Sequence, residues 1–160
     1  MAGLLRKLFR IGKLPPEVRA EVESEGVIHL SDCIAVVARF TGQIPGRRSV
    51  GLVRGYGGAL VLTNRRVLGL VSAIPARSGR GVDQPWTAPQ AGAVAGTLSE
   101  SGLVLTAADL SQVDPQFNGT LSLTFKTELP PEALSRVPTR AIAFDVPPKF
   151  VYSVLGVPRA

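Results

Sequence analysis

Short runs of β-branched and aliphatic residues, separated by turn-forming residues, make up most of the chain after residue 26. Val, Ile and Thr are enriched in strands because their branched side chains pack well on a pleated surface, whereas Gly, Pro, Asn and Ser are enriched in turns. The 17 Gly and 13 Pro are scattered, as expected of punctuation between short strands. The sequence therefore predicts a mainly β fold. The runs cover residues 27–30, 33–40, 49–54, 59–63, 67–71, 94–98, 103–106, 120–126 and 140–145.

Four segments between these runs are expected to be loops or turns. Residues 41–48 contain a Pro-Gly pair and residues 55–58 consist of Gly-Tyr-Gly-Gly, so both are expected to reverse the chain. Asn-Gly at 118–119 is a strong signal for a tight turn. The stretch 73–92 is longer than most loops and holds the only tryptophan. Trp86 either packs this loop onto the domain or stays exposed as an anchor, and packing is the favoured interpretation.

Helices are expected on both sides of the strands. A proline pair opens a helix over residues 17–24, in which Val18 and Val22 form a narrow apolar stripe. A second proline pair begins a short helical turn at residue 130, and a third opens a final helix that stops at Gly156. The apolar face of this last helix consists of Phe150, Val151, Val154 and Leu155.

Residues 3–14 combine apolar and basic side chains in the pattern of an amphipathic helix. Leu4, Leu8 and Ile11 recur at the helical period on one side. The basic side chains on the other side are Arg6, Lys7, Arg10 and Lys13. Such a helix suits an anionic membrane surface, but the same pattern describes a helix packed on its own domain or on a partner protein, and the three interpretations stay open. The segment is too short to be stable alone, so we expect it to dock.

Positive charge is distributed unevenly along the chain, whose net charge is +6. Residues 1–20 carry a net +4, and residues 33–82 carry eight Arg and no Lys, Asp or Glu. An acidic run at 21–25 separates the two basic regions. Arg is suited to bidentate contacts with phosphate and carboxylate groups. The arginine block is therefore either a solvated face or a binding face for an anionic partner.

Several features favour a cytoplasmic location. Basic residues interrupt the apolar residues near the N-terminus, so the chain has no apolar core of a secretory signal there. No run approaches the roughly 18 apolar residues that cross a bilayer. Cys33 is the only cysteine, which rules out an internal disulfide and is expected to be a small buried residue. We expect a cytoplasmic protein, with peripheral attachment to the inner face of the membrane as a further option.

The sequence lacks the residue arrangements that catalysis needs. His29, the only histidine, lies in a short apolar run, and no sequence pattern of a catalytic nucleophile with a histidine base surrounds it. One Cys and one His cannot supply a zinc site by themselves. Acidic residues outside 21–25 are isolated, and the glycines at 55–58 are not followed by the helix of a phosphate-binding loop. We therefore expect a non-enzyme with no catalytic residue, no metal and no cofactor.

One segment carries a resemblance to a known family. Residues 58–68, Gly-Ala-Leu-Val-Leu-Thr-Asn-Arg-Arg-Val-Leu, resemble the LTNRRL strand–turn–strand of bacterial pleckstrin-homology-like (PH-like) and GRAM-like domains, including small uncharacterised actinobacterial members. The likeness extends over 25–150 in layout and over 55–72 in specific residues. It implies a PH-like β-barrel of about seven strands with a C-terminal helix over residues 26–158, preceded by an N-terminal helical extension over residues 1–25.

The resemblance also implies roles for individual residues. Leu60 and Leu62 would face the barrel interior, while Thr63 and Asn64 would shape the turn after them. PH domains that bind phosphoinositides place basic residues around the loop between their first two strands. The basic residues that the resemblance draws attention to are Arg47 and Arg48 in the matching loop, Arg54 on the next strand, and Arg65 and Arg66 on the later hairpin.

The sequence as a whole predicts a non-catalytic binding or adaptor domain that engages an anionic membrane surface or a protein partner. The alternatives are a carrier of an apolar ligand inside the barrel and a nucleic-acid-binding protein, the latter disfavoured because no aromatic stacking platform accompanies the arginines. Pairing between copies of the chain through sheet edges is a further option. The candidate binding residues are Arg6, Lys7, Arg10, Lys13, Arg47, Arg48, Arg54, Arg65 and Arg66.

Overall fold

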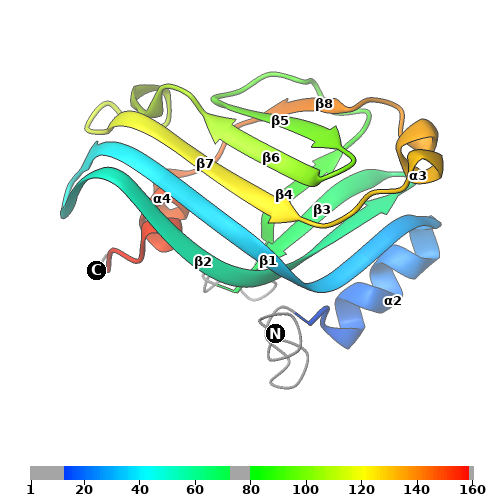
Figure 1. The fold of residues 1–160 in the computed structure, drawn as a ribbon. Helices are drawn as coiled ribbons and strands as arrows, with labels where there is room; N and C mark the ends of the chain where they lie inside the picture. Colours follow the sequence, from blue (N-terminus) through cyan, green and yellow to red (C-terminus); the bar gives the residue numbers. More distant parts are fainter. Residues whose placement is uncertain (1–12, 73–79, 159–160) are drawn as a thin grey trace.

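The computed structural model describes residues 13–72 and 80–158, and within them the chain forms a single antiparallel sheet of eight strands that bends into a nearly closed barrel (Figure 1). The strand order is β4-β3-β2-β1-β7-β6-β5-β8. The strands are β1 (Val27–Ile44), β2 (Arg47–Thr63), β3 (Arg66–Val71), β4 (Arg80–Pro85), β5 (Val94–Ser99), β6 (Gly102–Ala107), β7 (Asn118–Lys126) and β8 (Ala141–Phe144). The helices are α2 (Pro16–Glu25), α3 (Pro131–Arg136), α4 (Pro148–Leu155) and the 3₁₀ turn η1 (Leu110–Gln112). The mainly β expectation with flanking helices is confirmed.

The two longest strands, β1 and β2, form one hairpin that crosses the whole barrel (Figure 1). The prediction of a loop over 41–48 was wrong, because both strands continue until a turn at Pro45 and Gly46. The prediction of a turn over 55–58 was also wrong, because these glycines lie within β2. A Cβ on Gly58 would lie 2.2 Å from the carbonyl oxygen of Leu70 on β3. Glycine here permits the close approach of neighbouring strands rather than a reversal of the chain.

A bulge joins the first two predicted strands into one. The β1 register shifts between Ser31 and Ile34, and Cys33 within the shift has a φ of 54°. An extra residue in a bulge bends a strand and raises its twist. The runs at 27–30 and 33–40 are therefore both parts of β1, and Cys33 is half-buried at the bend.

The long loop predicted over 73–92 is replaced in part by a strand, because β4 occupies residues 80–85 and pairs with β3. Trp86 follows β4 directly. Its side chain is only 9 % exposed and its indole Nε1 donates a hydrogen bond to the carbonyl oxygen of Thr63 at 2.8 Å. The packing interpretation of Trp86 is confirmed.

The Asn-Gly pair at 118–119 was expected to make a tight turn, but it begins β7 and pairs with β1. Gly119 has a φ of 103°, and a Cβ there would lie 2.1 Å from the carbonyl oxygen of Thr41. This position needs glycine because of its backbone conformation and its close neighbour. In the sequence, such a glycine looks the same as a glycine in a turn.

Alternating side chains of β2 build two apolar clusters on its two sides. Leu60 and Leu62 belong to the barrel interior, as expected, together with Phe40 and Phe125. The intervening residues of β2 and their neighbours on β3 form a second cluster beneath α2. Its buried members are Leu14, Val18, Val22, Ala59, Val61, Leu68 and Leu70. The predicted stripe of α2 therefore docks this helix on the outer wall of the barrel.

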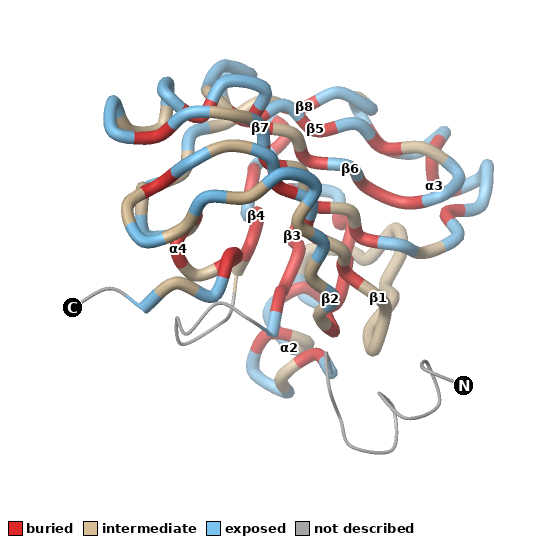
Figure 2. Tube along the Cα trace, turned by 60° about the vertical axis from the view of Figure 1, so that its left-hand side comes forward, coloured by how far each residue is buried: buried red, intermediate tan, exposed pale blue. Residues whose placement is uncertain are grey.

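The last helix closes the molecule at another place. Along α4, Val151, Val154 and Leu155 are almost fully buried, and Phe150 packs against the core, as predicted. Gly156 ends the helix in the left-handed conformation. Figure 2 shows buried residues along the strands and on α4, with exposed residues alternating with them along the strands.

Side chains rather than a backbone ladder link the two edge strands of the barrel. β4 and β8 are the ends of the strand order and do not pair. The amide nitrogen of Gln84 on β4 donates to the carbonyl oxygen of Ala143 on β8 at 3.3 Å, and the side-chain oxygen of Gln90 accepts from the Ala143 N–H at 2.9 Å. Gln84 of β4 and Gln90 of the segment after β4 thus bridge this seam through their side chains. No helix in the described ranges is long and apolar enough to span a membrane.

Candidate functional site

The outer face of β1, β2 and β7 presents polar, basic and small apolar side chains in cross-strand rows. Arg39 of β1 lies between Val53 of β2 and Ser122 of β7 in one row. Thr41 lies opposite Thr120 in the next row. Residues directly opposite one another in an antiparallel pair point to the same side of the sheet. The register therefore brings these five side chains together on one surface.

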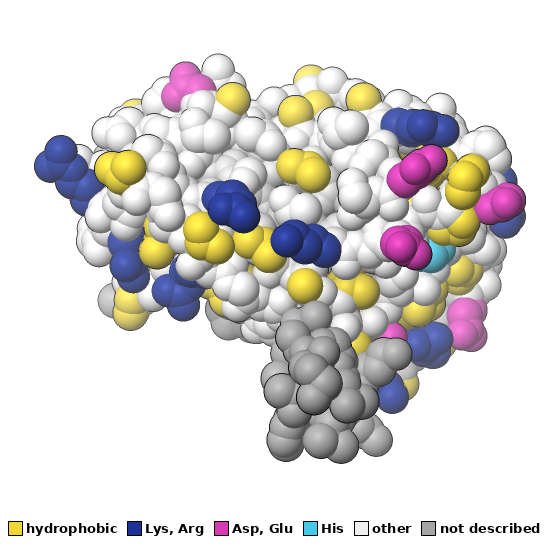
Figure 3. All heavy atoms as spheres, in the orientation of Figure 1, with side chains coloured by type: hydrophobic (Ala, Val, Ile, Leu, Met, Phe, Trp, Pro, Cys, Tyr) yellow, Lys and Arg dark blue, Asp and Glu magenta, His cyan; other side chains and the backbone are white. Residues whose placement is uncertain are grey.

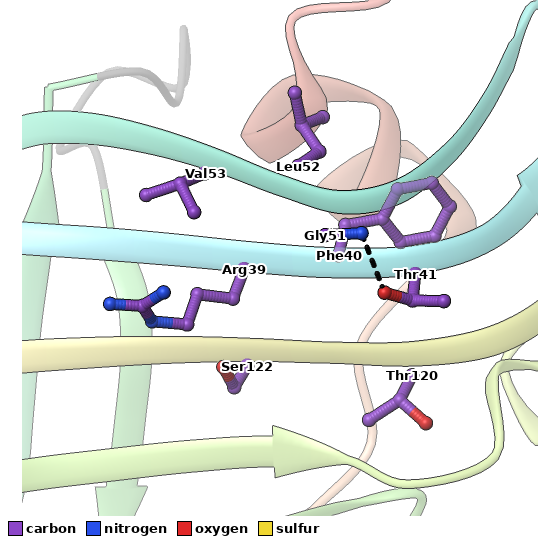
Figure 4. Close-up of a pocket in the computed structure, with 8 residues that line it drawn as sticks. All are labelled: Arg39, Phe40, Thr41, Gly51, Leu52, Val53, Thr120 and Ser122. Atoms are coloured by element: carbon purple, nitrogen blue, oxygen red, sulfur yellow. Dashed lines mark hydrogen bonds between the residues drawn. The ribbon is translucent and has the colours of Figure 1, made fainter.

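A bulge in β2 opens this surface. Phe40 pairs with Leu52 and Gly42 pairs with Ser49, so two residues of β2, Val50 and Gly51, face a single residue of β1. Gly51 has a φ of 68°, a backbone conformation that residues other than glycine rarely adopt. Its N–H donates to the Thr41 hydroxyl oxygen at 2.9 Å, which replaces the ladder bond that the bulge disrupts (Figure 4).

A shallow pocket of about 250 Å³ lies over this bulge (Figure 4). No atom lies within 4 Å of the position that a Gly51 Cβ would take, so the absence of a side chain leaves the pocket open. In Figure 4 the Arg39 side chain extends along the sheet away from Thr41, and its guanidinium lies to the left of Ser122. The pocket is lined by Arg39, Phe40, Thr41, Gly51, Leu52, Val53, Thr120 and Ser122.

The charge of this face is uncompensated. Arg39 and Arg48 are exposed and make no hydrogen bond or ion pair with any described residue. Residues 33–63 and 118–126, which carry the face, contain no Asp or Glu, and the one acid of β1, Asp32, lies before the bulge at Cys33 and pairs with Arg19. In Figure 3, Lys and Arg side chains lie over the left and centre of this side of the molecule and also at the right, where most of the Asp and Glu side chains in view lie beside them. An anion approaching the face meets positive charge without a competing carboxylate beside it.

The structure separates the predicted arginines of the first hairpin. Arg48 pairs with the exposed Gln43 and belongs to the outer face. Arg47 pairs with the buried Ile44 and is on the other side of β2. Arg6, Lys7 and Arg10 lie outside the described residues, whereas Lys13 is described and exposed.

Arg54 also lies on the side away from the outer face, against α4. Its Nε donates to the Tyr56 hydroxyl at 2.8 Å, and its guanidinium carbon lies 5.8 Å from the centroid of that ring. The Tyr56 hydroxyl in turn donates to the carbonyl oxygen of Val154, and a Cβ on Gly156 would meet the Arg54 guanidinium within 3 Å. A cation at the C-terminus of a helix is favourable. Arg54 therefore has a structural role in fastening α4 to β2.

Arg66 is held by three carboxylates. Its side chain is 10 % exposed, and it donates to Glu25 at 2.9 and 3.1 Å, to Glu21 at 2.6 Å and to both oxygens of Asp83 at 2.9 Å. Arg80 adds contacts to Glu21 and Asp83. The group ties α2 to β3 and β4.

The pKa values of this charged group follow from its contacts. Burial disfavours the charged form of Arg66, but the hydrogen bonds to Asp83, Glu25 and Glu21 outweigh it and raise its pKa above the ordinary value. The hydrogen bond from Arg66 lowers the pKa of Glu21 against the opposing effect of desolvation, and Arg80 contributes further. The three carboxylates therefore neutralise Arg66 within the fold.

The Thr63 side chain organises the turn between β2 and β3. The Thr63 hydroxyl oxygen accepts from the backbone N–H groups of Arg65 and Arg66 at 3.1 and 3.0 Å. Arg65 is exposed at the tip. A second hollow of about 460 Å³ beside it includes Asn64, Trp86 and the Arg66 group. Its charged side chains apart from Arg65 are engaged with one another, which leaves less unpaired charge there than on the outer face.

Two other features bear on the alternatives. The cavity among Val94, Leu105, Leu123 and Phe150 measures about 10 Å³, the space of a single water molecule, so this part of the barrel interior has no room for an apolar ligand. Burial lowers the pKa of His29, whose Nε2 lies 2.7 Å from the Ser31 hydroxyl. Among the described residues no cluster of three or more His, Cys, Asp or Glu could hold a metal ion.

Sequence reasoning placed Arg39 within the arginine block but did not single it out, and it missed Thr41, Gly51, Thr120 and Ser122. The alternation along residues 33–40 and 120–126 could have assigned Arg39 and Ser122 to polar faces. Nothing in the sequence gives the β1–β7 register that sets them side by side, because these strands are about 80 residues apart.

No protein-family model matches the chain, and no curated protein matches it.

Proposed function

We propose that this protein is a non-catalytic binding module that docks on an anionic membrane surface through the outer face of β1, β2 and β7. The observation that carries the proposal is the uncompensated charge of that face: Arg39 and Arg48 have no partner among the described residues, on strands without neighbouring carboxylates. Each Lys or Arg close to an anionic leaflet contributes about 1 kcal/mol of attraction. The two arginines would together supply about 2 kcal/mol before screening.

Exposed apolar side chains on the same hairpin support a membrane rather than a soluble anion as the partner. Val50 is 91 % exposed and lies two residues after Arg48 in β2. Val53 is 52 % exposed and lies opposite Arg39 of β1. Single exposed valines are ordinary on protein surfaces. Valines placed between unpaired arginines can enter the headgroup region while the guanidinium groups contact phosphates.

The proposal includes a PH-like barrel as scaffold. It is supported by the unbroken order β4-β3-β2-β1-β7-β6-β5, by the C-terminal helix packed on the core, and by the turn at Thr63. The eighth strand, β8, and the docked α2 are additions to the seven strands that the resemblance implies. The basic residues of 1–14 would add to the attraction, since Leu14 is anchored on the barrel and Lys13 is exposed.

Vesicle binding tests the proposal. Co-sedimentation with vesicles of phosphatidylcholine and phosphatidylglycerol should rise with the anionic fraction and fall with salt. The double variant Arg39→Gln/Arg48→Gln removes about 2 kcal/mol, so we expect a loss of binding of about 30-fold.

A matched control separates this face from net charge alone. Arg136→Gln/Arg140→Gln changes the charge equally, at two exposed arginines on α3 and just before β8. We expect this control to bind nearly as well as the unaltered protein. Equal losses in the two double variants would show that the outer face is not the docking surface.

A further inference from the structure

The pocket over the β2 bulge gathers several hydrogen-bond donors. Docking by positive charge alone would not require them. The Thr41 hydroxyl oxygen accepts from the Gly51 N–H, so its own hydrogen stays available to donate. The Ser122 hydroxyl has no partner among the described residues. Arg39 adds up to five N–H donors and is likewise without a partner there.

Acceptors are scarce around the same pocket. The Thr120 hydroxyl donates to the carbonyl oxygen of Ala108 at 3.1 Å, so it adds no free donor, and the side-chain acceptors of the lining are the hydroxyl oxygens of Thr41, Thr120 and Ser122. No carboxylate lines the pocket. A site with free donors from Arg39, Thr41 and Ser122, and no negative charge, selects an anion with several acceptor oxygens.

The size of the pocket limits the ligand to a small group. Its volume of about 250 Å³ is below the roughly 300–1,000 Å³ of pockets for drug-sized ligands. It is an open depression over the sheet, next to Val53, which is 52 % exposed. A headgroup could enter it while the rest of the molecule stays outside in a membrane.

We infer that this pocket binds the phosphomonoester headgroup of a membrane lipid, with Arg39, Thr41 and Ser122 as donors. This inference rests on the proposed membrane docking. A phosphomonoester presents three terminal oxygens and a charge of about −1.5 to −2 at neutral pH, against two terminal oxygens and one charge for a phosphodiester. Three sets of donors match the three oxygens. The Arg39 guanidinium turns toward the pocket on binding, since no contact with a described residue holds it in its present position.

The lipid experiment compares phosphatidic acid with phosphatidylglycerol in vesicles matched for surface charge. The unaltered protein should prefer phosphatidic acid, and Ser122→Ala should reduce that preference about tenfold without changing binding to phosphatidylglycerol, because the change removes a donor and no charge. Thr124→Val is the matched control, since Thr124 follows on the same face of β7 but does not line the pocket. Equal binding to both lipids, or a preference that survives Ser122→Ala, would overturn the inference.

A soluble arm distinguishes the source of the phosphate. Titration of the ¹⁵N-labelled protein with glycerol phosphate should shift the amide resonances of Thr41, Gly51 and Ser122, and inorganic phosphate should do so more weakly. Vesicle binding without these shifts would overturn the pocket and leave the docking face standing. Shifts without any vesicle binding would refute both the proposed function and the lipid as the source.

Discussion

Neighbouring residues of the same type have opposite environments in this protein. Arg65 is exposed at the turn after β2, whereas Arg66 begins β3 with a side chain that is 10 % exposed among three carboxylates. The sequence shows two consecutive arginines and does not show that Glu21, Glu25 and Asp83 converge on the second, since these acids lie 17 to 45 residues away. Residue identity therefore predicted a basic hairpin but not the division of its charge.

This difference predicts different effects of two substitutions. Arg66→Ala leaves three carboxylates without their shared cation and should lower the free energy of unfolding by about 2 kcal/mol, less than for a fully buried pair because Glu21 and Asp83 are partly exposed. Arg65→Ala should change it by less than about 0.5 kcal/mol. Urea unfolding measures both, and equal effects would contradict the role assigned to Arg66.

The same group predicts a pH dependence. The pKa of Glu21 is lowered below its ordinary 4.5 in the folded protein, chiefly by the hydrogen bond from Arg66. Its contribution to stability is therefore complete above about pH 4.5 and is lost as the pH falls through the lower folded value. Unfolding free energies measured across this range should fall less steeply with acidification in Glu21→Gln than in the unaltered protein. An unchanged slope would show that Glu21 does not contribute.

At the scale of elements, the sequence predicted the existence of strands and helices better than their ends. The final helix with its apolar face and its stop at Gly156 was confirmed because capping and periodicity are local signals. The glycines at 55–58 were wrongly predicted to form a turn. A glycine required by a close neighbouring strand looks the same in the sequence as a glycine in a turn. The missing information was the position of the partner strand.

Two glycines of β2 provide a direct comparison. Gly58→Ala places a Cβ 2.2 Å from the Leu70 carbonyl oxygen and 2.6 Å from Val36, so we expect it to lower the melting temperature by several degrees. A Cβ on Gly55 has no atom within 4 Å, and its φ is not in the left-handed region. Gly55→Ala should therefore leave the melting temperature unchanged or raise it slightly. A larger loss at Gly55 than at Gly58 would contradict the strand register.

At the scale of the whole molecule, long-range features decide the architecture and none of them was predictable from local patterns. The β1–β7 pairing builds the outer face, the docking of α2 covers β2 and β3, and the two glutamines bridge the seam between β4 and β8. Each joins segments far apart in the chain. The candidate pocket depends on the β1–β7 pairing, so its hydroxyl groups could not be identified from the sequence alone.

The glutamine seam should be the weakest part of the barrel wall. Gln90→Ala removes the acceptor of the Ala143 N–H, so we expect this amide to exchange with solvent at least tenfold faster while β6 keeps its protection. Gln116→Ala, at an exposed glutamine away from the seam, is the matched control. Hydrogen exchange by NMR measures each amide, and an unchanged rate at Ala143 would contradict bridging of the seam by these side chains.

The proposed membrane-docking face can be mapped directly. The ¹⁵N-labelled protein, mixed with anionic nanodiscs that carry a spin-labelled lipid, should lose resonance intensity where it faces the bilayer. Loss at residues 39–41, 48–53 and 120–122, with intensity kept at 132–140, is the result that the proposed function predicts. Loss centred on α3 and β8, or no loss at any residue, would contradict it.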